Sequence, residues 1–196
     1  MILYWKELLK SHIYQIIGSK LHRFHTPMEQ VIQYLRYSRL LPSKGCSALE
    51  MFGMFGLWHT KDYVKAVEHI DFFEIDKKIM KYAKKSFRKE NVDFHCADSI
   101  QYIKNTNKKY DLVIADEPDC LDLYEKETGL PIFLKYMFRV SKENGILIFN
   151  IRTGCLPKWK KIKEKIYSMA AEEGVKEIFF VVRHRKLTYV VVALGR

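Results

Sequence analysis

The segment that most constrains the fold runs from residue 48 to residue 76. It predicts a strand over 48–51, a glycine-bearing turn over 52–56, a helix, and a second strand that ends at Glu74. A nucleotide-binding βαβ unit has this order, because its turn lets the backbone approach a ligand and its helix N-terminus offers unpaired N–H groups. A carboxylate at the tip of the second strand can accept hydrogen bonds from two ribose hydroxyls. The segment therefore predicts the opening of a nucleotide-binding α/β domain.

Strands and helices continue to alternate after this unit. Counted from the first, we expect strands over 47–51, 69–74, 92–96, 110–115, 146–150, 177–184 and 187–194, and helices over 58–66, 77–88, 99–104, 130–140 and 157–172. The strand over 110–115 is almost continuously apolar, as a strand covered on both faces should be. The last two strands are joined by a tight basic turn at Arg185 and Lys186. The pattern predicts an α/β fold with a doubly wound, mostly parallel seven-stranded sheet and a C-terminal antiparallel hairpin.

Two helices are expected before the sheet. The first covers residues 3–20, and the second opens at Thr26-Pro27-Met28-Glu29, where Thr26 and Glu29 form a capping box and Pro27 suits the first helical position. The run 42–45 ends this helix. Because no repeat, linker or low-complexity segment appears, we expect one domain over 1–196, with a helical extension over 1–44 and a core over 45–196.

The sequence pattern favours neither a membrane protein nor a metal-binding protein. No apolar run reaches the roughly 18 residues of a membrane span. The N-terminus carries charged residues in its apolar pattern and has no small-residue cleavage site, so we expect a cytoplasmic protein. The four cysteines are singly spaced, and His22-x-x-His25 has no cysteine pair nearby, so no metal site is expected.

The charge balance leaves two interpretations open. Lysine and arginine total 34 against 23 acidic residues, for a net charge of +11, which favours an anionic partner such as nucleic acid. However, the lysines within 77–89 and 158–165 fall on the polar faces of predicted helices, where lysine is a common solvated residue. The oligomeric state is not indicated.

Several short motifs together resemble the class I S-adenosylmethionine-dependent methyltransferase superfamily, which has a Rossmann-like fold. The resemblance covers about residues 45–196 and rests on the first turn, Glu74-Ile75-Asp76, Ala97-Asp98-Ser99, the run from Asp111 to Asp116, and Gly145 before the strand over 146–150. In that superfamily the first turn usually reads acid-x-Gly-x-Gly-x-Gly. Here it reads Glu50-Met-Phe-Gly53-Met-Phe-Gly56, so Phe52 and Met54 occupy two of the glycine positions and Gly53 is shifted.

The resemblance implies S-adenosylmethionine as cofactor and a set of binding residues. The turn containing Glu50, Gly53 and Gly56 would lie against the methionine part, and Glu74 would bind the ribose hydroxyls. The remaining contacts would be Ile75 on the adenine face, Asp98 and the Ser99 backbone on the adenine amino edge, and Asp116 beside the methyl group. Glu74, Asp76 and Asp98 have an alternative interpretation as helix N-caps or loop acids.

The chain reverses its charge where the strand over 110–115 ends. Six acids fall within residues 116–127, and such a loop repels phosphate and attracts cations. Methyl transfer is an in-line displacement in which the protein mainly positions the nucleophile, and a carboxylate helps an amine by taking its proton. Asp116 and Asp119 are therefore the candidate catalytic residues, and a small, amine-type molecule is the expected acceptor.

Other functions remain open beside methyl transfer. Residues 72–87, 110–119 and 145–149 also resemble aminopropyltransferases such as spermidine synthase, in which two acids three apart, here Asp116 and Asp119, hold and deprotonate the attacking amine. Transfer of the aminopropyl or aminocarboxypropyl arm of the cofactor to an amine is therefore a second alternative. Residues 26–35 and 49–56 resemble small metal-dependent O-methyltransferases, but the Asp-Asn pair of their metal site is Phe149-Asn150 here. A third alternative is a non-catalytic Rossmann-like module that binds RNA or protein through its lysine-rich faces.

Overall fold

The computed structural model of the chain describes residues 27–54, 56, 60–86, 91–115, 129–152, 156–184 and 187–195. The helix predicted over 3–20, the cap at Thr26 and the turn at Arg185 and Lys186 lie outside these residues.

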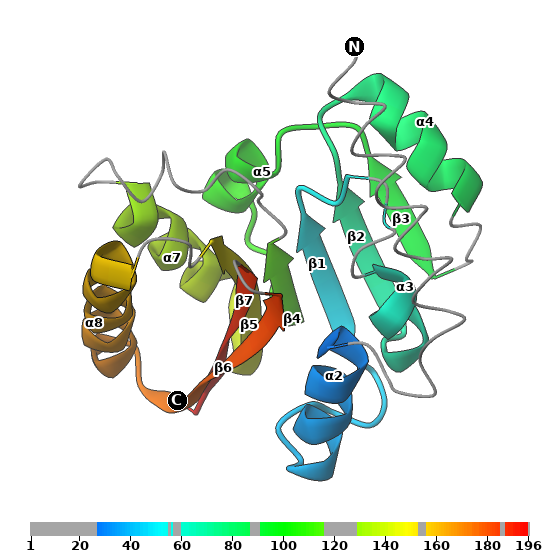
Figure 1. Ribbon diagram of the computed structural model, residues 1–196. Helices are drawn as coiled ribbons and strands as arrows, with labels where there is room; N and C mark the ends of the chain where they lie inside the picture. Colours follow the sequence, from blue (N-terminus) through cyan, green and yellow to red (C-terminus); the bar gives the residue numbers. More distant parts are fainter. Residues whose placement is uncertain are drawn as a thin grey trace.

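A seven-stranded sheet forms the centre of the molecule, in the order β3-β2-β1-β4-β5-β7-β6 (Figure 1). The strands are β1 Ser47–Met51, β2 His69–Phe73, β3 Val92–His95, β4 Tyr110–Ala115, β5 Ser141–Arg152, β6 Val175–His184 and β7 Leu187–Leu194. Strands β1 to β5 pair in parallel, and β7 pairs antiparallel with both β5 and β6. The predicted doubly wound sheet and its C-terminal hairpin are confirmed.

The start of β5 differs from the prediction of a strand over 146–150. Tyr110 of β4 pairs with Ser141 and Leu112 pairs with Ile146, so extra residues of β5 bulge between these two pairs. Glu143-Asn144-Gly145 has the composition of a turn, but the backbone carries it within the strand as an irregular opening, because a bulge can absorb additional residues without ending the pairing. Strand β6 likewise begins at Val175, two residues before the predicted start.

Helices cover both faces of the sheet (Figure 1). One face carries α2 Pro27–Tyr37, α3 Thr60–Tyr63 and α4 Lys77–Ser86, and the other carries α5 Ser99–Asn105, α7 Gly129–Val140 and α8 Leu156–Glu172. Helix α2 begins at Pro27, as predicted, whereas the helix expected over 58–66 is only the short α3 followed by the 3-10 turn η1 Val64–Ala66. In the part of the chain that the structure describes, no helix is long and apolar enough to cross a membrane.

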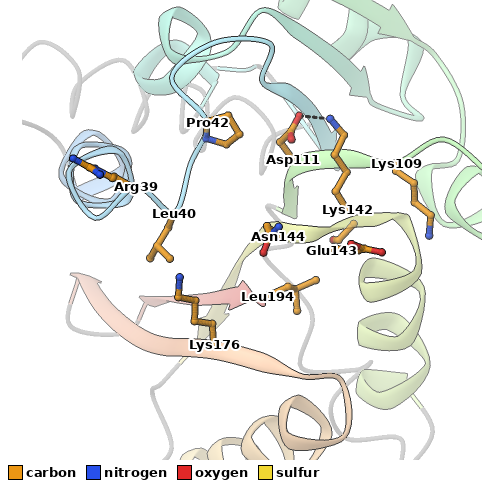
Figure 2. A pocket seen from close by; sticks show the side chains of 11 residues that line it. Arg39, Leu40, Pro42, Lys109, Asp111, Lys142, Glu143, Asn144, Lys176 and Leu194 are labelled. Atoms are coloured by element: carbon orange, nitrogen blue, oxygen red, sulfur yellow. Dashed lines mark hydrogen bonds and ion pairs between the residues drawn. The ribbon is translucent and has the colours of Figure 1, made fainter. Parts of the chain in front are cut away.

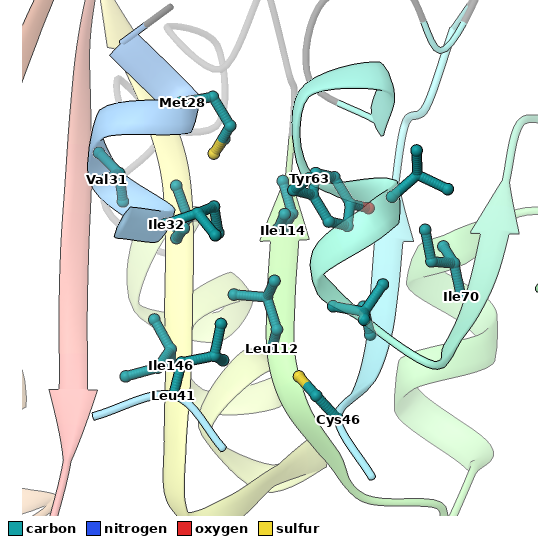
Figure 3. Packing of buried hydrophobic residues seen from close by; sticks show 14 of the residues in the cluster. Met28, Val31, Ile32, Leu41, Cys46, Tyr63, Ile70, Leu112, Ile114 and Ile146 are labelled. Atoms are coloured by element: carbon teal, nitrogen blue, oxygen red, sulfur yellow. The ribbon is translucent and has the colours of Figure 1, made fainter. Parts of the chain in front are cut away.

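Helix α2 is fixed to the sheet by its apolar side. Met28, Val31 and Ile32 of α2 belong to one buried cluster with Leu112 and Ile114 of the sheet (Figure 3). Cys46 lies in the same cluster, just before β1, and burial raises the pKa of its thiol to about 12. This packing fastens α2 to one face of the sheet.

Candidate functional site at the carboxyl edge of the sheet

The turn after β1 keeps a left-handed backbone without the usual glycines. Phe52 has φ of 57°, Met54 has φ of 47° and Gly56 has φ of 66°. Left-handed φ values cost a residue with a Cβ about 1–2 kcal/mol, which is why glycine is usual in such turns. Phe52 and Met54 are the residues that stand at two glycine positions of the superfamily pattern. The backbone shape of that pattern is therefore present, although the residue type is not.

Gly53 has a different role from its neighbours. Its N–H donates to the carbonyl of Phe73 at 2.9 Å, and its carbonyl accepts from the N–H of Gly56 at 2.8 Å. A Cβ at Gly53 would stand 2.3 Å from a ring carbon of Phe72, a fully buried side chain of β2. Glycine is needed here because the turn packs directly on the end of β2.

Glu50 lies beneath the turn and faces the protein interior. Its carboxylate is buried and accepts hydrogen bonds from the Thr60 hydroxyl at 2.6 Å and the Tyr63 hydroxyl at 2.5 Å. Burial, and then the charge of Glu50, raises the pKa of Tyr63 well above its usual value. Glu50 thus fastens α3 to the end of β1, and the structure gives its carboxylate a supporting position under the turn.

Glu74 joins the first turn to the loop after β2. Its Oε2 accepts from the Met54 N–H at 3.0 Å and its Oε1 accepts from the Asp76 N–H at 2.8 Å. An ionised carboxylate has about four acceptor positions, so both oxygens can accept further hydrogen bonds. Ile75 is 67% exposed although it is large and apolar. A carboxylate beside an exposed apolar side chain fits the ribose hydroxyls and the base face of a nucleoside.

Asp76 and Asp98 both act as helix N-caps. Asp76 Oδ1 accepts from the N–H groups of residues 78 and 79 at the start of α4, at 2.7 and 3.1 Å. Asp98 Oδ1 accepts from Ile100 and Gln101 at the start of α5, at 2.8 and 3.3 Å. Ser99 follows as a buried residue. Both acids therefore cap helices, and both capping bonds of Asp98 fall on Oδ1. The contact of Asp98 with adenine that the resemblance implies stays a prediction.

The predicted catalytic acids Asp116 and Asp119 lie outside the described residues. The strand that leads to them ends at Ala115, which is paired with Met51 of β1. The chain therefore leaves β4 beside the residue that opens the first turn, which is the neighbourhood that the sequence predicts for Asp116.

A cavity lies at the opposite, amino-terminal edge of the sheet (Figure 2). It has a volume of about 840 Å³, and its lining includes the cationic residues Arg39, Lys109, Lys142 and Lys176. Asp111 also lines this cavity and is ion-paired with Lys142 at 2.7 Å. None of the predicted cofactor-binding residues lines it, so it is a separate feature from the candidate site.

Sequence reasoning missed one polar cluster, on β2 and β3. Asp71 is buried and accepts hydrogen bonds from His95, Lys108 and Tyr110, with His69 at 3.3 Å. The available signal is the pair of motifs His69-x-Asp71 and Asp93-x-His95. Because alternate residues of a strand share a face, each motif places two polar side chains on one side of the sheet.

Comparison with known proteins decides the family. The model of the spermine/spermidine synthase domain matches residues 62–189. The chain belongs to the spermine/spermidine synthase domain family. Members of this family are similar in sequence: the polyamine aminopropyltransferase of Methanocaldococcus jannaschii is 36% identical over 95 residues, covering 43% of this chain and 31% of the relative. That of Clostridium botulinum is 30% identical over 95 residues, covering 43% and 32%.

The chain spans about a third of the length of these two polyamine aminopropyltransferases. Among solved structures, a S-adenosylmethionine-dependent methyltransferase from Clostridium acetobutylicum superposes with a TM-score of 0.67, covering 97% of this chain and 99% of the other at 14% identity. Identity this low indicates the fold alone. The chain thus has a Rossmann-like fold of the class I methyltransferase type and sequence similarity to spermine/spermidine synthase domains.

Proposed function

We propose that this protein is a transferase that binds an S-adenosyl donor at the carboxyl edge of β1, β2 and β3 and passes a group from its sulfonium to an amine. One observation supports the donor site above the others. The Glu74 carboxylate is held by two backbone N–H groups, next to the exposed Ile75 and the left-handed turn. That arrangement offers acceptors to ribose hydroxyls and an apolar surface to adenine.

We favour an aminopropyl group, taken from decarboxylated S-adenosylmethionine. Support comes from the family match and from relatives named polyamine aminopropyltransferase, because sequence kinship bears on reaction type more closely than fold does. In this reaction the amine nitrogen attacks the aminopropyl carbon that is bound to the sulfonium. The bond between that carbon and sulfur breaks, and 5′-methylthioadenosine leaves. Asp116 and Asp119 are proposed to hold the amine and accept the proton that its nitrogen loses.

Methyl transfer from S-adenosylmethionine is the second candidate. It is favoured by the nearly complete mutual coverage with the Clostridium acetobutylicum methyltransferase, whereas only about a third of each aminopropyltransferase is matched. Here the amine would take the methyl group and S-adenosylhomocysteine would leave. The proposed donor site is the same in both reactions, so the two differ in which bond to sulfur breaks.

Thermal unfolding with each donor tests the proposal. Decarboxylated S-adenosylmethionine, S-adenosylmethionine, S-adenosylhomocysteine and 5′-methylthioadenosine are titrated separately. A ligand at about 100 times its Kd adds roughly 2.7 kcal/mol, which corresponds to a rise in Tm on the order of 5–10 °C for a chain of this length. Mass spectrometry of a mixture with diamines and polyamines then identifies the group transferred. No rise with any of the four would contradict the donor site and favour a non-catalytic binding module.

Matched variants locate the site. Ile75→Ser should weaken donor binding about fivefold to tenfold through lost apolar contact, whereas Tyr37→Ser changes an even more exposed large side chain, at the end of α2, and should not. Glu74→Gln should weaken binding at least about tenfold, because a charged acceptor is lost, and Glu172→Gln on α8 is its control. Asp116→Asn and Asp119→Asn should lower kcat by about 10²–10⁴, and Asp119→Asn, which is not among the predicted donor contacts, should leave donor binding intact.

A further inference from the structure

Two parallel edge strands bring four potential metal ligands onto one face of the sheet. His69 and Asp71 belong to β2, and Asp93 and His95 belong to β3, with Asp71 directly paired with Asp93. One ligand atom from each of His69, Asp71 and Asp93 lies within 4.8 Å of the others. His95 lies two residues after Asp93 on the same strand, and its Nε2 approaches the same Asp71 oxygen.

Three separations among these atoms are close to those of a tetrahedral coordination sphere. Asp71 Oδ1 lies 3.3 Å from His69 Nε2 and 2.9 Å from His95 Nε2, and His69 Nε2 lies 3.8 Å from Asp93 Oδ2. Two ligands bound to zinc at about 2.0–2.1 Å in tetrahedral geometry stand about 3.3 Å apart. His69, Asp71 and Asp93 already lie within one ion's reach of one another, and the His95 side chain must rotate toward them to complete the coordination sphere.

We propose that His69, Asp71, Asp93 and His95 form a binding site for a divalent transition metal of the Zn²⁺ type. Two imidazole nitrogens and two carboxylate oxygens are a donor set suited to such an ion rather than to Mg²⁺ or Ca²⁺, which prefer six or more oxygens. Binding requires each Nε2 to be free of its proton, so the ion takes the place of the N–H groups that now point at Asp71 Oδ1.

The surroundings of Asp71 supply the support that metal ligands usually have. Its other oxygen, Oδ2, accepts from the Tyr110 hydroxyl at 2.6 Å and from Lys108 Nζ at 2.5 Å, and the Tyr102 hydroxyl in turn lies 2.6 Å from that of Tyr110. These bonds hold the Asp71 carboxylate in place and leave its Oδ1 facing the histidines.

The site also has an entry path from solvent. The Asp71 side chain is 6% exposed and forms the floor, whereas His69, His95 and Asp93 are 35%, 40% and 63% exposed. The His95 ring is stacked on Phe73 at a centroid distance of 4.5 Å, which orients its nitrogen toward Asp71. Three partly exposed ligands above one buried ligand let an ion enter without unfolding the strand pair.

Isothermal titration of the whole chain with Zn²⁺ tests the site, with Co²⁺ absorption as a report on geometry. We expect one site shared by both ions, a tetrahedral Co²⁺ visible spectrum, and no comparable binding of Mg²⁺. His69→Gln, His95→Gln and Asp93→Asn should each weaken Zn²⁺ binding at least about tenfold, since even outer partners of metal sites carry losses of that size. The Tm of each variant without metal verifies folding, and the mostly exposed Asp93 is the variant least able to disturb it.

The double variant His22→Gln, His25→Gln is the matched control, because it removes another closely spaced histidine pair from the chain. It should leave the Zn²⁺ affinity unchanged. The proposal is overturned if the chain binds no Zn²⁺, or if the control abolishes binding while the variants of β2 and β3 retain it. These measurements use no S-adenosyl compound, so their result is independent of the proposed transferase activity.

Discussion

Met54 holds a left-handed φ of 47° while its N–H donates to Glu74. This hydrogen bond helps to maintain the left-handed conformation, because it ties the Met54 N–H to Glu74, the candidate ribose-binding residue. The backbone strain of a residue with a Cβ nevertheless remains, at about 1–3 kcal/mol.

Replacing Met54 by glycine should therefore stabilise the protein. The expected gain in the free energy of unfolding is about 1 kcal/mol, since relief of strain exceeds the additional chain entropy that glycine loses on folding, about 0.5–1 kcal/mol. Urea denaturation measures the change. Met54→Ala is the control, because alanine keeps the left-handed penalty and removes the thioether. A destabilised Met54→Gly would mean that side-chain contacts outweigh the strain.

Gly53 should be the most sensitive position of the same turn. Gly53→Ala places a Cβ against the buried Phe72 ring and should cost about 1–3 kcal/mol, the usual penalty of overpacking. Phe72→Leu in the same chain should recover part of the loss by removing the ring atoms that clash. A double-mutant cycle of unfolding free energies measures this coupling. Strictly additive effects would refute the packing explanation for Gly53.

At the scale of elements, Asp111 ties three strands together at the amino edge of the sheet. From β4 it accepts the N–H and the hydroxyl of Ser47 in β1, at 2.8 and 3.0 Å, and it pairs with Lys142 in β5 at 2.7 Å (Figure 2). Burial by itself would raise the pKa of Asp111, but the hydrogen bonds from Lys142 and Ser47 prevail and hold the pKa below its usual value.

This tie should make stability depend on pH in the acid range. A depressed folded-state pKa gives stability that is present above the unfolded value, about 3.9, and is lost as the pH falls through the lower folded-state value. Asp111→Asn should cost about 1–2 kcal/mol at pH 6, with Lys142 discounted because it is half exposed. Chemical denaturation at pH 6 and pH 2.5 should show the difference between parent and variant shrinking at the lower pH. A constant difference would mean that the charge of Asp111 is irrelevant.

At the scale of the whole molecule, the lysines of α4 form a basic surface. Lys78, Lys81 and Lys85 are exposed, while Met80 and Ala83 of the same helix are buried. We predict weak binding of single-stranded RNA at 50 mM salt that falls about a hundredfold at 200 mM, as expected when a few phosphate contacts release counterions. Fluorescence anisotropy would measure it. Lys78→Gln with Lys81→Gln should weaken binding, whereas Lys135→Gln with Lys160→Gln should not. If Lys78→Gln with Lys81→Gln left RNA binding unchanged, the lysines of α4 would be only a solvated helix face.

The architecture was readable from the sequence because its hydrophobic period is strong. The apolar run over 110–115 and the unit over 48–76 identify the parallel sheet directly, since their patterns depend only on local burial. The opening of β5 was not readable, because a bulge is decided by the register against β4. The inward direction of Glu50 and the convergence of His69 with His95 depend on contacts between elements. Those contacts are set by tertiary packing, which one sequence does not display.

In the first turn, Phe52 and Met54 hold the left-handed conformation that glycine adopts most easily. Two hydrogen bonds hold the loop to the end of β2, from Gly53 to Phe73 and from Met54 to Glu74. Substitutions at positions 52 and 54 can then accumulate while the dihedral angles stay the same. A search for relatives that counts glycine letters would pass over such chains, whereas a search on the φ values of this loop would retrieve them. The turn thus keeps the backbone shape of the pattern in residues that a glycine-based pattern does not contain.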